Sequence, residues 1–332
     1  MMDIRIEERV FHFRQPAGTS RGVYHERRSW LVTMKEGDMV GVGECAPLPD
    51  LSCDALPPQR YLEKLTAFCD AIALTGRIDS VDMTDYPSMR FGIETAFCNM
   101  HASPLPAPQA IPINGLVWMG SYDEMLGRLE EKLAQGFRCV KLKVGAIDFE
   151  CELELVRRVR QRFSPRELEL RLDANGGFTP DEALYKLELL SQYAIHSIEQ
   201  PIKKEQWACM AELCRDAPLP IALDEELIGI NTPDAKRQML RIIKPAYIVL
   251  KPSLHGGMSG CREWIQIARE EGIGSWITSA LESNIGLYSI ARFCLSVYQP
   301  VSMPQGLGTG QLFTDNIPMP LEMRGDKLWV MK

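Results

Sequence analysis

Seven short β-rich runs recur at a nearly constant spacing over the second part of the chain, and amphipathic helical stretches separate them. Successive runs end 25 to 30 residues apart, which is the length of one strand, one helix and two loops. Eight such units close a barrel of parallel strands, although spacing alone also permits a doubly wound open sheet. The runs cover residues 113–117, 139–144, 168–173, 196–199, 221–224, 247–251 and 275–279, with a weak eighth run at 305–307.

Charged residues stand near the carboxyl ends of five of these runs, where strands of a parallel sheet are expected to be apolar. Barrel enzymes build their sites at this end of the strands, so we expect the charges to meet. Two lysines share one face of their strand because side chains alternate along it. The charged residues are Lys141 and Lys143 on one strand, followed by Asp173, Glu199, Asp224 and Lys251 on the next four.

Each charge also has a purely structural interpretation. Asp173 precedes a glycine-rich segment and is of a type that caps turns and helices, and Glu199 can belong to a loop. Asp224 is followed by Glu225 and Glu226, so its register is open. The lysines can lie on an exposed edge or at a solvated strand end. Five successive units carry a charge at the same place with complementary signs, and this coincidence favours a functional site.

Three carboxylates without a nearby histidine or cysteine favour a hard, six-coordinate cation such as Mg²⁺. Such a cation, bound to a substrate carboxylate, would stabilise the enediolate that forms when the α-proton leaves. A lysine must be neutral to accept that proton, and the positive charges of Lys141 and the metal favour neutral Lys143. Lys251 would approach from the opposite face, as a second acid/base or as a fixed positive charge.

The first hundred residues have a different pattern. Alternating apolar and polar residues at 4–11 and 30–34 predict antiparallel strands, and helical patterns cover 58–75 and 88–101. A proline cluster then interrupts the chain at positions 104, 106, 108 and 112. We therefore predict a domain boundary at this cluster, in a chain of 332 residues that is long enough for two domains.

Composition limits the partners and the compartment. The net charge of −7 and a pI near 5.4 argue against nucleic acid and anionic membranes, so a small anionic substrate needs a local positive site. The ten cysteines form neither a CxxC pair nor a zinc-type cluster and are expected to be buried free thiols. With no signal-peptide pattern and no apolar run of about 18 residues, we expect a cytoplasmic protein. The oligomeric state stays open.

The strand-end motifs resemble those of the enolase superfamily, in its muconate-lactonizing branch with paired lysines. The resemblance implies an α/β fold, with a (β/α)7β TIM-type barrel over residues 111–310. An α+β capping domain over 1–110 would be completed by the C-terminal tail 311–332. The resemblance lies in Lys141-Leu142-Lys143, Arg171-Leu172-Asp173-Ala174-Asn175, Ile198-Glu199-Gln200-Pro201, Leu223-Asp224-Glu225, Lys251-Pro252-Ser253 and Ser279-Ala280-Leu281-Glu282-Ser283.

The resemblance also implies roles for the charged residues. Asp173, Glu199 and Asp224 would hold Mg²⁺, with Mn²⁺ as a possible substitute. Lys143 would remove the α-proton of the substrate. Lys251 would stabilise the enolate from the other face.

Four further residues are candidates for contact with the substrate. Arg171 would support the metal region, and Ser279 would bind the substrate together with backbone N–H groups of the loop that begins at Gly306. The alternative for that loop is a simple glycine turn. Arg21 lies where the superfamily has a mobile loop that covers the substrate, and the alternative is a solvated arginine.

The segments at 43–52, 87–92 and 112–116 resemble members that dehydrate 2-succinyl-6-hydroxy-2,4-cyclohexadiene-1-carboxylate in menaquinone biosynthesis. Racemisation and epimerisation begin with the same enediolate, so N-succinylamino acid racemase is the nearest alternative. Dipeptide epimerases carry Asp-x-Asp at the eighth strand, where this chain has Gly306-Leu307-Gly308. Muconate cycloisomerase is a further alternative. A non-catalytic metal-binding barrel would not need lysines on both sides.

Overall fold

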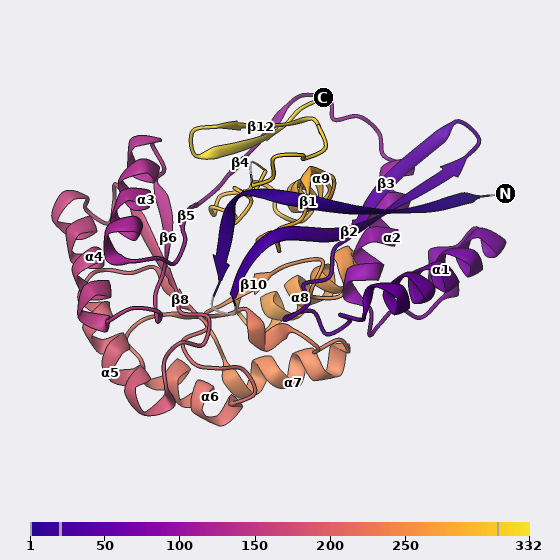
Figure 1. Ribbon diagram of the computed structural model, residues 1–332. Helices are drawn as coiled ribbons and strands as arrows, with labels where there is room; N and C mark the ends of the chain where they lie inside the picture. The colour runs from indigo at the N-terminus through magenta and orange to yellow at the C-terminus, as the bar shows by residue number, and fades with distance from the viewer. Residues whose placement is uncertain (1, 20–21, 311) are drawn as a thin grey trace.

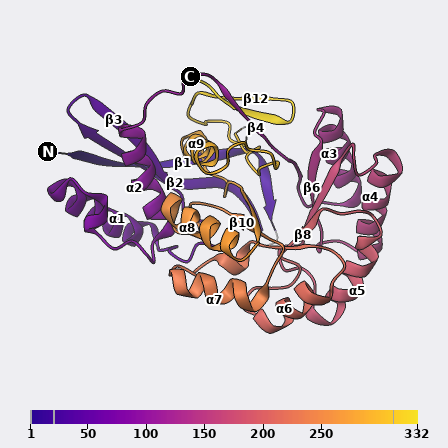
Figure 2. The ribbon, with the colours of Figure 1, turned by 180° about the vertical axis from the view of Figure 1, so that it is seen from behind.

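The computed structural model describes residues 2–19, 22–310 and 312–332, and Figures 1 and 2 show it from opposite sides. An N-terminal region of antiparallel strands and two helices lies beside an arc of helices that surrounds parallel strands (Figure 1). The N-terminal region consists of β1 (Asp3–Thr19), β2 (Gly22–Glu36), β3 (Met39–Cys45), α1 (Pro58–Thr75), a short 3₁₀ helix (Ile78–Ser80) and α2 (Pro87–Met100).

The N-terminal sheet packs one face on its helices. Its strands pair in the order β1-β2-β3, and β1 and β2 run antiparallel with Ile4 opposite Met34. Because side chains alternate along a strand, Trp30, Val32 and Met34 of β2 all lie in one buried cluster with residues of α1 and α2. This region therefore has an apolar core of its own.

The predicted β-rich runs form parallel strands that pair in sequence order, from β5 to β11. Each is connected to the next by a helix on the outside (Figure 2), the arrangement expected of βα units. The strands are β5 (Gly115–Val117), β6 (Cys139–Lys143), β7 (Glu169–Asp173), β8 (Ser197–Glu199), β9 (Ile221–Leu223), β10 (Tyr247–Leu250) and β11 (Gly274–Ile277). The helices are α3 (Tyr122–Ala134), α4 (Phe149–Arg162), α5 (Pro180–Ser191), α6 (Trp207–Asp216), α7 (Pro233–Ile243), α8 (Gly257–Glu270) and α9 (Asn284–Val297).

The weak eighth run connects the two ends of this sheet. Gln305 bridges Ile113 and Gly306 bridges Thr278, both in parallel orientation. The backbone N–H of Asn114 donates to the carbonyl of Gln305 at 3.0 Å, and that of Gly306 donates to Ile277 at 2.8 Å. Position 306 must be a glycine for this approach, because a Cβ there would lie 2.2 Å from Oγ1 of Thr278. The parallel strands therefore close into a barrel, and the open-sheet alternative is wrong.

The C-terminal tail contacts both parts of the molecule. Strands β12 (Leu321–Arg324) and β13 (Lys327–Val330) form a small antiparallel sheet with β4 (Gln109–Pro112), and Leu328 and Val330 belong to the barrel's apolar cluster. Phe313, in contrast, packs on Phe13 of β1 with ring centroids 4.6 Å apart. The assignment of residues 1–110 and 311–332 to a capping domain stays a prediction.

Local expectations agree with most of these bounds. Helix α1 matches the predicted 58–75, and α2 begins one residue before the predicted 88. The first predicted run, 113–117, begins later as a strand, because Ile113 and Asn114 pair with Gln305 instead. All ten cysteines are free, but Cys53 and Cys98 are exposed, so the expectation that all are buried is wrong. No helix among the described residues is long and apolar enough to cross a membrane.

Candidate active site

The charged residues at the strand ends meet at one end of the barrel. The register of β6, β7 and β8 places Lys143 beside Asp173 and Asp173 beside Glu199. Lys141 Nζ lies 2.9 Å from Oδ2 of Asp173 and 3.0 Å from Oε2 of Glu199. Lys143 Nζ lies 3.0 Å from the same Asp173 oxygen. The sequence argument that these side chains gather in one place is therefore confirmed for these residues.

Lys251 contacts the next carboxylate of the series. Its Nζ donates a hydrogen bond to Oδ2 of Asp224, and Asp224 follows β9 directly. All three carboxylates are buried, with at most 1% of each residue exposed. We call Lys141, Lys143, Lys251, Asp173, Glu199 and Asp224 the strand-end cluster.

Burial and neighbouring charges shift the pKa values of the cluster. Burial opposes ionisation of Asp173, but the ammonium groups of Lys141 and Lys143 outweigh it and hold the pKa of Asp173 below its usual value. Burial and the charge of Asp173 raise the pKa of Glu199 to about 8. Burial would lower the pKa of Lys141, but Asp173 and Glu199 raise it. Glu199 is therefore the carboxylate whose charge the neighbouring amines compensate least.

Two residues that the sequence left without a role also belong to this site. Asn175 accepts a hydrogen bond from Lys143 through Oδ1, and its Nδ2 donates to Oε1 of Glu225 at 3.0 Å. Asn175 has a φ of 43°, in the left-handed region where asparagine is enriched among non-glycine residues. The Asp-Ala-Asn-Gly segment signalled a turn, but only the fold shows that this turn brings an amide to Lys143.

The cluster has the donor set of a hard divalent cation. Its donors are buried carboxylate oxygens, and Oδ1 of Asp224 is buried without a hydrogen-bond partner among the described residues. The amines of Lys141 and Lys251 contact other oxygens of the same carboxylates. Over residues 2–19, 22–310 and 312–332, no three acidic, histidine or cysteine side chains stand in a ready-made metal geometry. A cation at this place therefore competes with the lysine amines.

Ser279 and Gly306 lie side by side beyond β11. The N–H of Ser279 donates to the carbonyl of Gly306 at 3.1 Å, and Oγ of Ser279 lies 2.6 Å from Oγ1 of Thr309. The N–H of Gly306 donates to the carbonyl of Ile277, so we expect the other N–H groups of this loop to receive a substrate carboxylate. Contact of Ser279 or of the following loop with the substrate stays a prediction.

Arg171 pairs with Lys141 in the β6–β7 register, but its guanidinium contacts other residues. Its guanidinium donates to Oε1 of Glu169 at 2.7 Å and to the carbonyl of Pro304 at 2.9 Å, and it stacks 4.6 Å from the ring centre of Trp276. Residues 169 and 171 share one face of β7 below Asp173, because side chains alternate. The guanidinium of Arg171 therefore contacts the barrel interior, and its support of the metal region stays a prediction. Arg21 lies outside the described residues.

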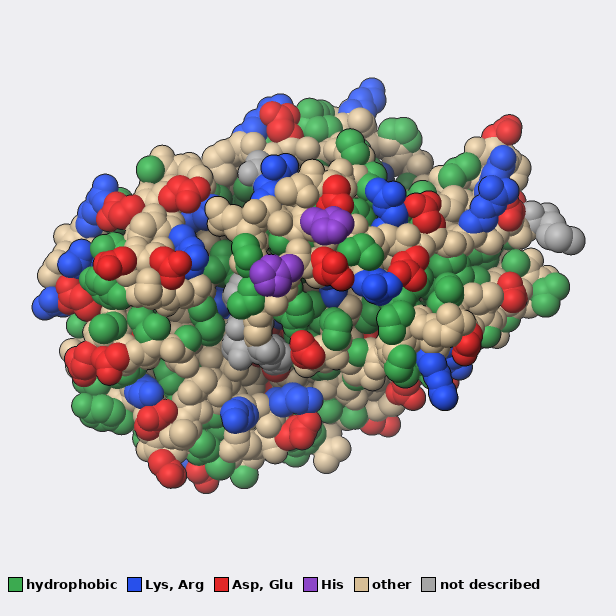
Figure 3. Space-filling model, viewed as in Figure 1, with side chains coloured by type: hydrophobic (Ala, Val, Ile, Leu, Met, Phe, Trp, Pro, Cys, Tyr) green, Lys and Arg blue, Asp and Glu red, His purple; other side chains and the backbone are tan. Residues whose placement is uncertain are grey.

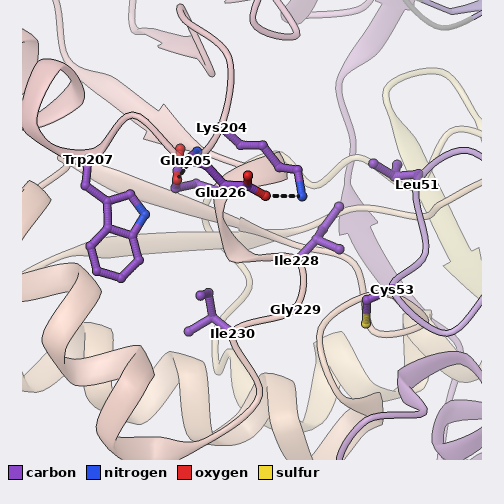
Figure 4. Close-up of a pocket in the computed structure, with 9 residues that line it drawn as sticks. All are labelled: Leu51, Cys53, Lys204, Glu205, Trp207, Glu226, Ile228, Gly229 and Ile230. Atoms are coloured by element: carbon purple, nitrogen blue, oxygen red, sulfur yellow. Dashed lines mark hydrogen bonds and ion pairs between the residues drawn. The ribbon is translucent and has the colours of Figure 1, made fainter.

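A pocket of about 490 Å³ lies between the N-terminal region and the loops after β8 and β9 (Figure 4). Glu226, in its wall, accepts a hydrogen bond from Nε2 of Gln200 at 3.2 Å, and Oε1 of Gln200 accepts from the N–H of Asp224 at 3.3 Å. The pocket is thus linked to the backbone of the strand-end cluster. It is lined by Leu51, Cys53, Lys204, Glu205, Trp207, Glu226, Ile228, Gly229 and Ile230.

The outer surface differs from the cluster in its charge pattern. On the face seen in Figure 3, acidic and basic side chains are interspersed over the helices and strands. A nucleic-acid-binding surface would gather basic side chains in one patch. That nucleic acid is not a partner stays a prediction.

Both the N-terminal region and the barrel match known protein families. Residues 124–331 match the family described as "Enolase C-terminal domain-like", and residues 19–100 match "MenC, N-terminal domain". The o-succinylbenzoate synthase of Desulfotalea psychrophila is 44% identical over 356 residues, and the match covers 96% of each chain. The o-succinylbenzoate synthase of Haemophilus influenzae is 31% identical, over 87% of this chain and 84% of that one.

Solved structures share the fold. The crystal structure of MenC from Desulfotalea psychrophila has a TM-score of 0.81 at 39% identity, and the match covers 98% of this chain and 99% of that one. The L-Ala-D/L-Glu epimerase of Bacillus subtilis has a TM-score of 0.84 at 21% identity, covering 99% and 96%, a likeness of fold alone. Because the barrel family covers more than half of the sequence, the chain belongs to the enolase superfamily.

Proposed function

We propose that the chain is an o-succinylbenzoate synthase, a lyase of menaquinone biosynthesis. The reaction is the dehydration of 2-succinyl-6-hydroxy-2,4-cyclohexadiene-1-carboxylate to 2-succinylbenzoate. One observation carries the proposal: the amines of Lys143, which is buried, and Lys251, which is partly buried, contact separate carboxylates of one buried acidic cluster. The 44% identity to a synthase of this activity over nearly the whole chain supports the substrate.

Lys143 performs the proton transfers in this proposal. Its neutral amine takes the proton from the ring carbon that bears the carboxylate, and the C–H electron pair moves into an enediolate. The ammonium then gives the same proton to the departing hydroxyl, so that water leaves from the same face and the ring becomes aromatic. General acid–base catalysis of this kind contributes roughly 10²- to 10⁴-fold to a rate.

Neighbouring residues restrict the orientation of the Lys143 amine. Asp173 Oδ2 and Asn175 Oδ1 each take one hydrogen bond from Nζ. A neutral amine has two N–H groups and one lone pair, so these two acceptors leave the lone pair for the substrate proton. Glu225 fixes the amide of Asn175 by accepting from its Nδ2, which keeps Oδ1 directed at Lys143.

We also propose that Asp173, Glu199 and Asp224 hold Mg²⁺, for which Mn²⁺ is a possible substitute. A divalent cation at this place supplies positive charge that stabilises the substrate carboxylate as it becomes an enediolate. Lys251, with its pKa raised by the charge of Asp224 against the effect of burial, stays protonated and stabilises the same anion. Lys141 keeps Asp173 and Glu199 together.

The test is the ultraviolet absorbance of purified protein mixed with the cyclohexadiene substrate. We expect the diene absorbance to be replaced by that of the aromatic product, and the turnover to stop in excess EDTA. Full activity in EDTA, or unchanged turnover after Lys143→Ala, would refute the mechanism. Racemisation of N-succinylamino acids is measured alongside, because lysines on two sides of a site permit it. Racemisation without dehydration would replace the proposed reaction.

A further inference from the structure

Two buried glutamates of the N-terminal region contact the first turns of two barrel helices. Glu44 lies in the buried part of β3 and Glu94 lies in α2, and they are 0% and 6% exposed. Their partners are 239 and 164 residues further along the chain. Neither glutamate belongs to the strand-end cluster, and the proposed reaction gives neither a role.

The carboxylate of Glu94 accepts hydrogen bonds from the first turn of α8. Its Oε2 accepts from the N–H groups of Met258 at 2.7 Å and Ser259 at 3.1 Å, and its Oε1 accepts from the hydroxyl of Ser259. The first N–H groups of a helix have no partner within the helix, and a negative charge there is favourable. Gly257 leaves room for the carboxylate, because a Cβ at that position would lie 2.5 Å from Oε2 of Glu94.

The carboxylate of Glu44 accepts hydrogen bonds from the start of α9 in the same way. Its Oε2 accepts from the N–H of Gly286 at 3.0 Å and from the hydroxyl of Ser283 at 2.6 Å. Its Oε1 accepts from the N–H of Ser283 at 3.1 Å and, within the N-terminal region, from the hydroxyl of Ser29 at 2.7 Å. Again a glycine permits the approach, since a Cβ at Gly286 would lie 2.9 Å from Oε2 of Glu44.

The start of α8 is joined closely to Lys251. The N–H groups of Leu254 and His255 donate to the carbonyl of Lys251 at 2.8 and 3.0 Å, and the N–H of Lys251 donates to Nδ1 of His255 at 2.9 Å. The N–H of Gly257 donates to the carbonyl of Pro252 at 2.9 Å. These hydrogen bonds wind the loop between β10 and α8 into a compact unit, so a shift of the first turn of α8 moves Lys251.

The start of α9 is joined to Ser279 by a separate loop. Glu282, which is fully buried, accepts from the N–H of Ala280 at 2.7 Å. Ser279 is held by the carbonyl of Gly306 on the other side. Glu282 directly precedes Ser283, the residue that Glu44 binds. A shift of the first turn of α9 therefore moves the loop that carries Ser279.

We propose that Glu94 and Glu44 are positioning residues that act through the first turns of α8 and α9, Glu94 on Lys251 and Glu44 on Ser279. The N-terminal region thereby sets two different parts of the site through two separate contacts. The kinetic consequences rest on the proposed function, in which Lys251 stabilises the anion, and on the prediction that Ser279 contacts the substrate. The structural consequence, local anchoring of each loop, does not.

The test compares Glu94→Gln with Glu44→Gln, each the control for the other. Both substitutions keep the size of the side chain but turn one acceptor oxygen into an NH₂ group that faces hydrogen-bond donors. In hydrogen–deuterium exchange we expect Glu94→Gln to speed exchange over residues 251–259 by roughly tenfold, with little change over 279–287. Glu44→Gln is expected to give the reverse pattern.

Kinetics separate the two positions further. We expect Glu94→Gln to lower kcat roughly tenfold with KM nearly unchanged, and Glu44→Gln to raise KM roughly tenfold with kcat nearly unchanged. Ser259→Ala and Ser283→Ala, which remove one donor to each glutamate, should show the same patterns more weakly. They replace the glutamine variants if those fail to fold.

Two results would overturn the inference. One is equal acceleration of exchange in both loops by either variant, which would indicate general destabilisation. The other is local exchange changes accompanied by identical effects of the two variants on kcat and KM. If the wild-type chain does not convert the cyclohexadiene, the proposed function fails, and the exchange pattern alone decides whether the two glutamates anchor separate loops.

Discussion

The loops that follow Lys143 and Lys251 are held by different parts of the molecule. After Lys143, Oε1 of Glu152 accepts from the N–H groups of Gly145 at 2.6 Å and Ala146 at 3.1 Å, and Glu152 belongs to α4, the next helix in the chain. After Lys251, the corresponding carboxylate is Glu94 of the distant helix α2. The loop after the proposed base is therefore held within its own βα unit. The opposite side depends on the docking of the N-terminal region.

This difference has a physical basis in local and long-range contacts. A carboxylate in the following helix reaches the preceding loop whenever the βα unit folds, so it adds little loop-closure cost. A carboxylate from the N-terminal region reaches its helix only after both parts have folded and packed. The geometry after Lys251 thus depends on a contact from outside the barrel, and we expect that changing this contact leaves the Lys143 side unchanged.

The largest expected effect comes from removing the lysines themselves. Lys143→Ala should lower kcat by about 10³-fold, because proton transfer loses its acid and base. Lys251→Ala should lower it less, by about 10²-fold, because it removes electrostatic stabilisation and leaves proton transfer in place. Steady-state absorbance assays of both variants measure the two losses in kcat. Equal losses would contradict the assignment of proton transfer to Lys143 alone.

A methyl group at the contact between Glu94 and α8 should weaken the packing of the N-terminal region on this helix. Gly257→Ala places a Cβ 2.5 Å from Glu94 Oε2 in a residue whose φ is 74°, so we expect a loss of about 2 kcal/mol or more in the free energy of unfolding. Gly127→Ala is the matched control: nothing lies within 4 Å of its Cβ in α3, and it should stabilise by about 0.5–1 kcal/mol. Urea denaturation measures both, and equal effects would show that the contact is unimportant.

The N-terminal region should also respond to pH through Asp54. Burial raises its pKa to about 6 from 3.8, so the folded state favours the protonated carboxyl. The contribution of Asp54 to the free energy of unfolding is fully present below pH 4. It is lost as the pH rises through about 6, and the total loss is about 3 kcal/mol. Asp54→Asn should remove this dependence. The difference in unfolding free energy between variant and wild type, measured from pH 4 to 7, tests it, and a constant difference would contradict the prediction.

The smallest effect is expected at Glu152, the carboxylate of α4 that binds the loop after Lys143. Glu152 uses a single oxygen for its N–H donors, so the carbonyl of Glu152→Gln can accept the same hydrogen bonds and only the charge is lost. We expect a cost of about 1 kcal/mol and faster amide exchange confined to the loop after Lys143. Acceleration in the loop after Lys251 would show that the two sides are coupled.

Much of the barrel and of the strand-end cluster could be predicted from the sequence. Spacing identified the βα units, and alternation placed Lys141 and Lys143 on one face, because both patterns depend on neighbouring residues alone. The position of each charge at a strand end then implied that the charges meet. Asn175 and Glu225 were missed, because their hydrogen bonds join turns from different βα units.

The sequence was less informative about contacts that depend on partners far away in the chain. Arg171 shares the interior face with Asp173, yet its guanidinium contacts Glu169, Pro304 and Trp276. The glycine at 306 reads as a turn or an anion-binding N–H, but the structure uses it to close the barrel against Thr278. In both cases the competing partner lies far away in the chain or in another layer of the barrel.

By itself, the sequence determined the order of the elements, the faces of the strands and the collection of carboxylates and lysines at one end, since these follow from local periodicity. Only the tertiary structure decided that residues 305 and 306 close the barrel and that Glu44 and Glu94 hold α9 and α8. The physical reason is that a buried carboxylate must find hydrogen-bond donors. Packing, and not the local pattern, determines which donors lie within its reach.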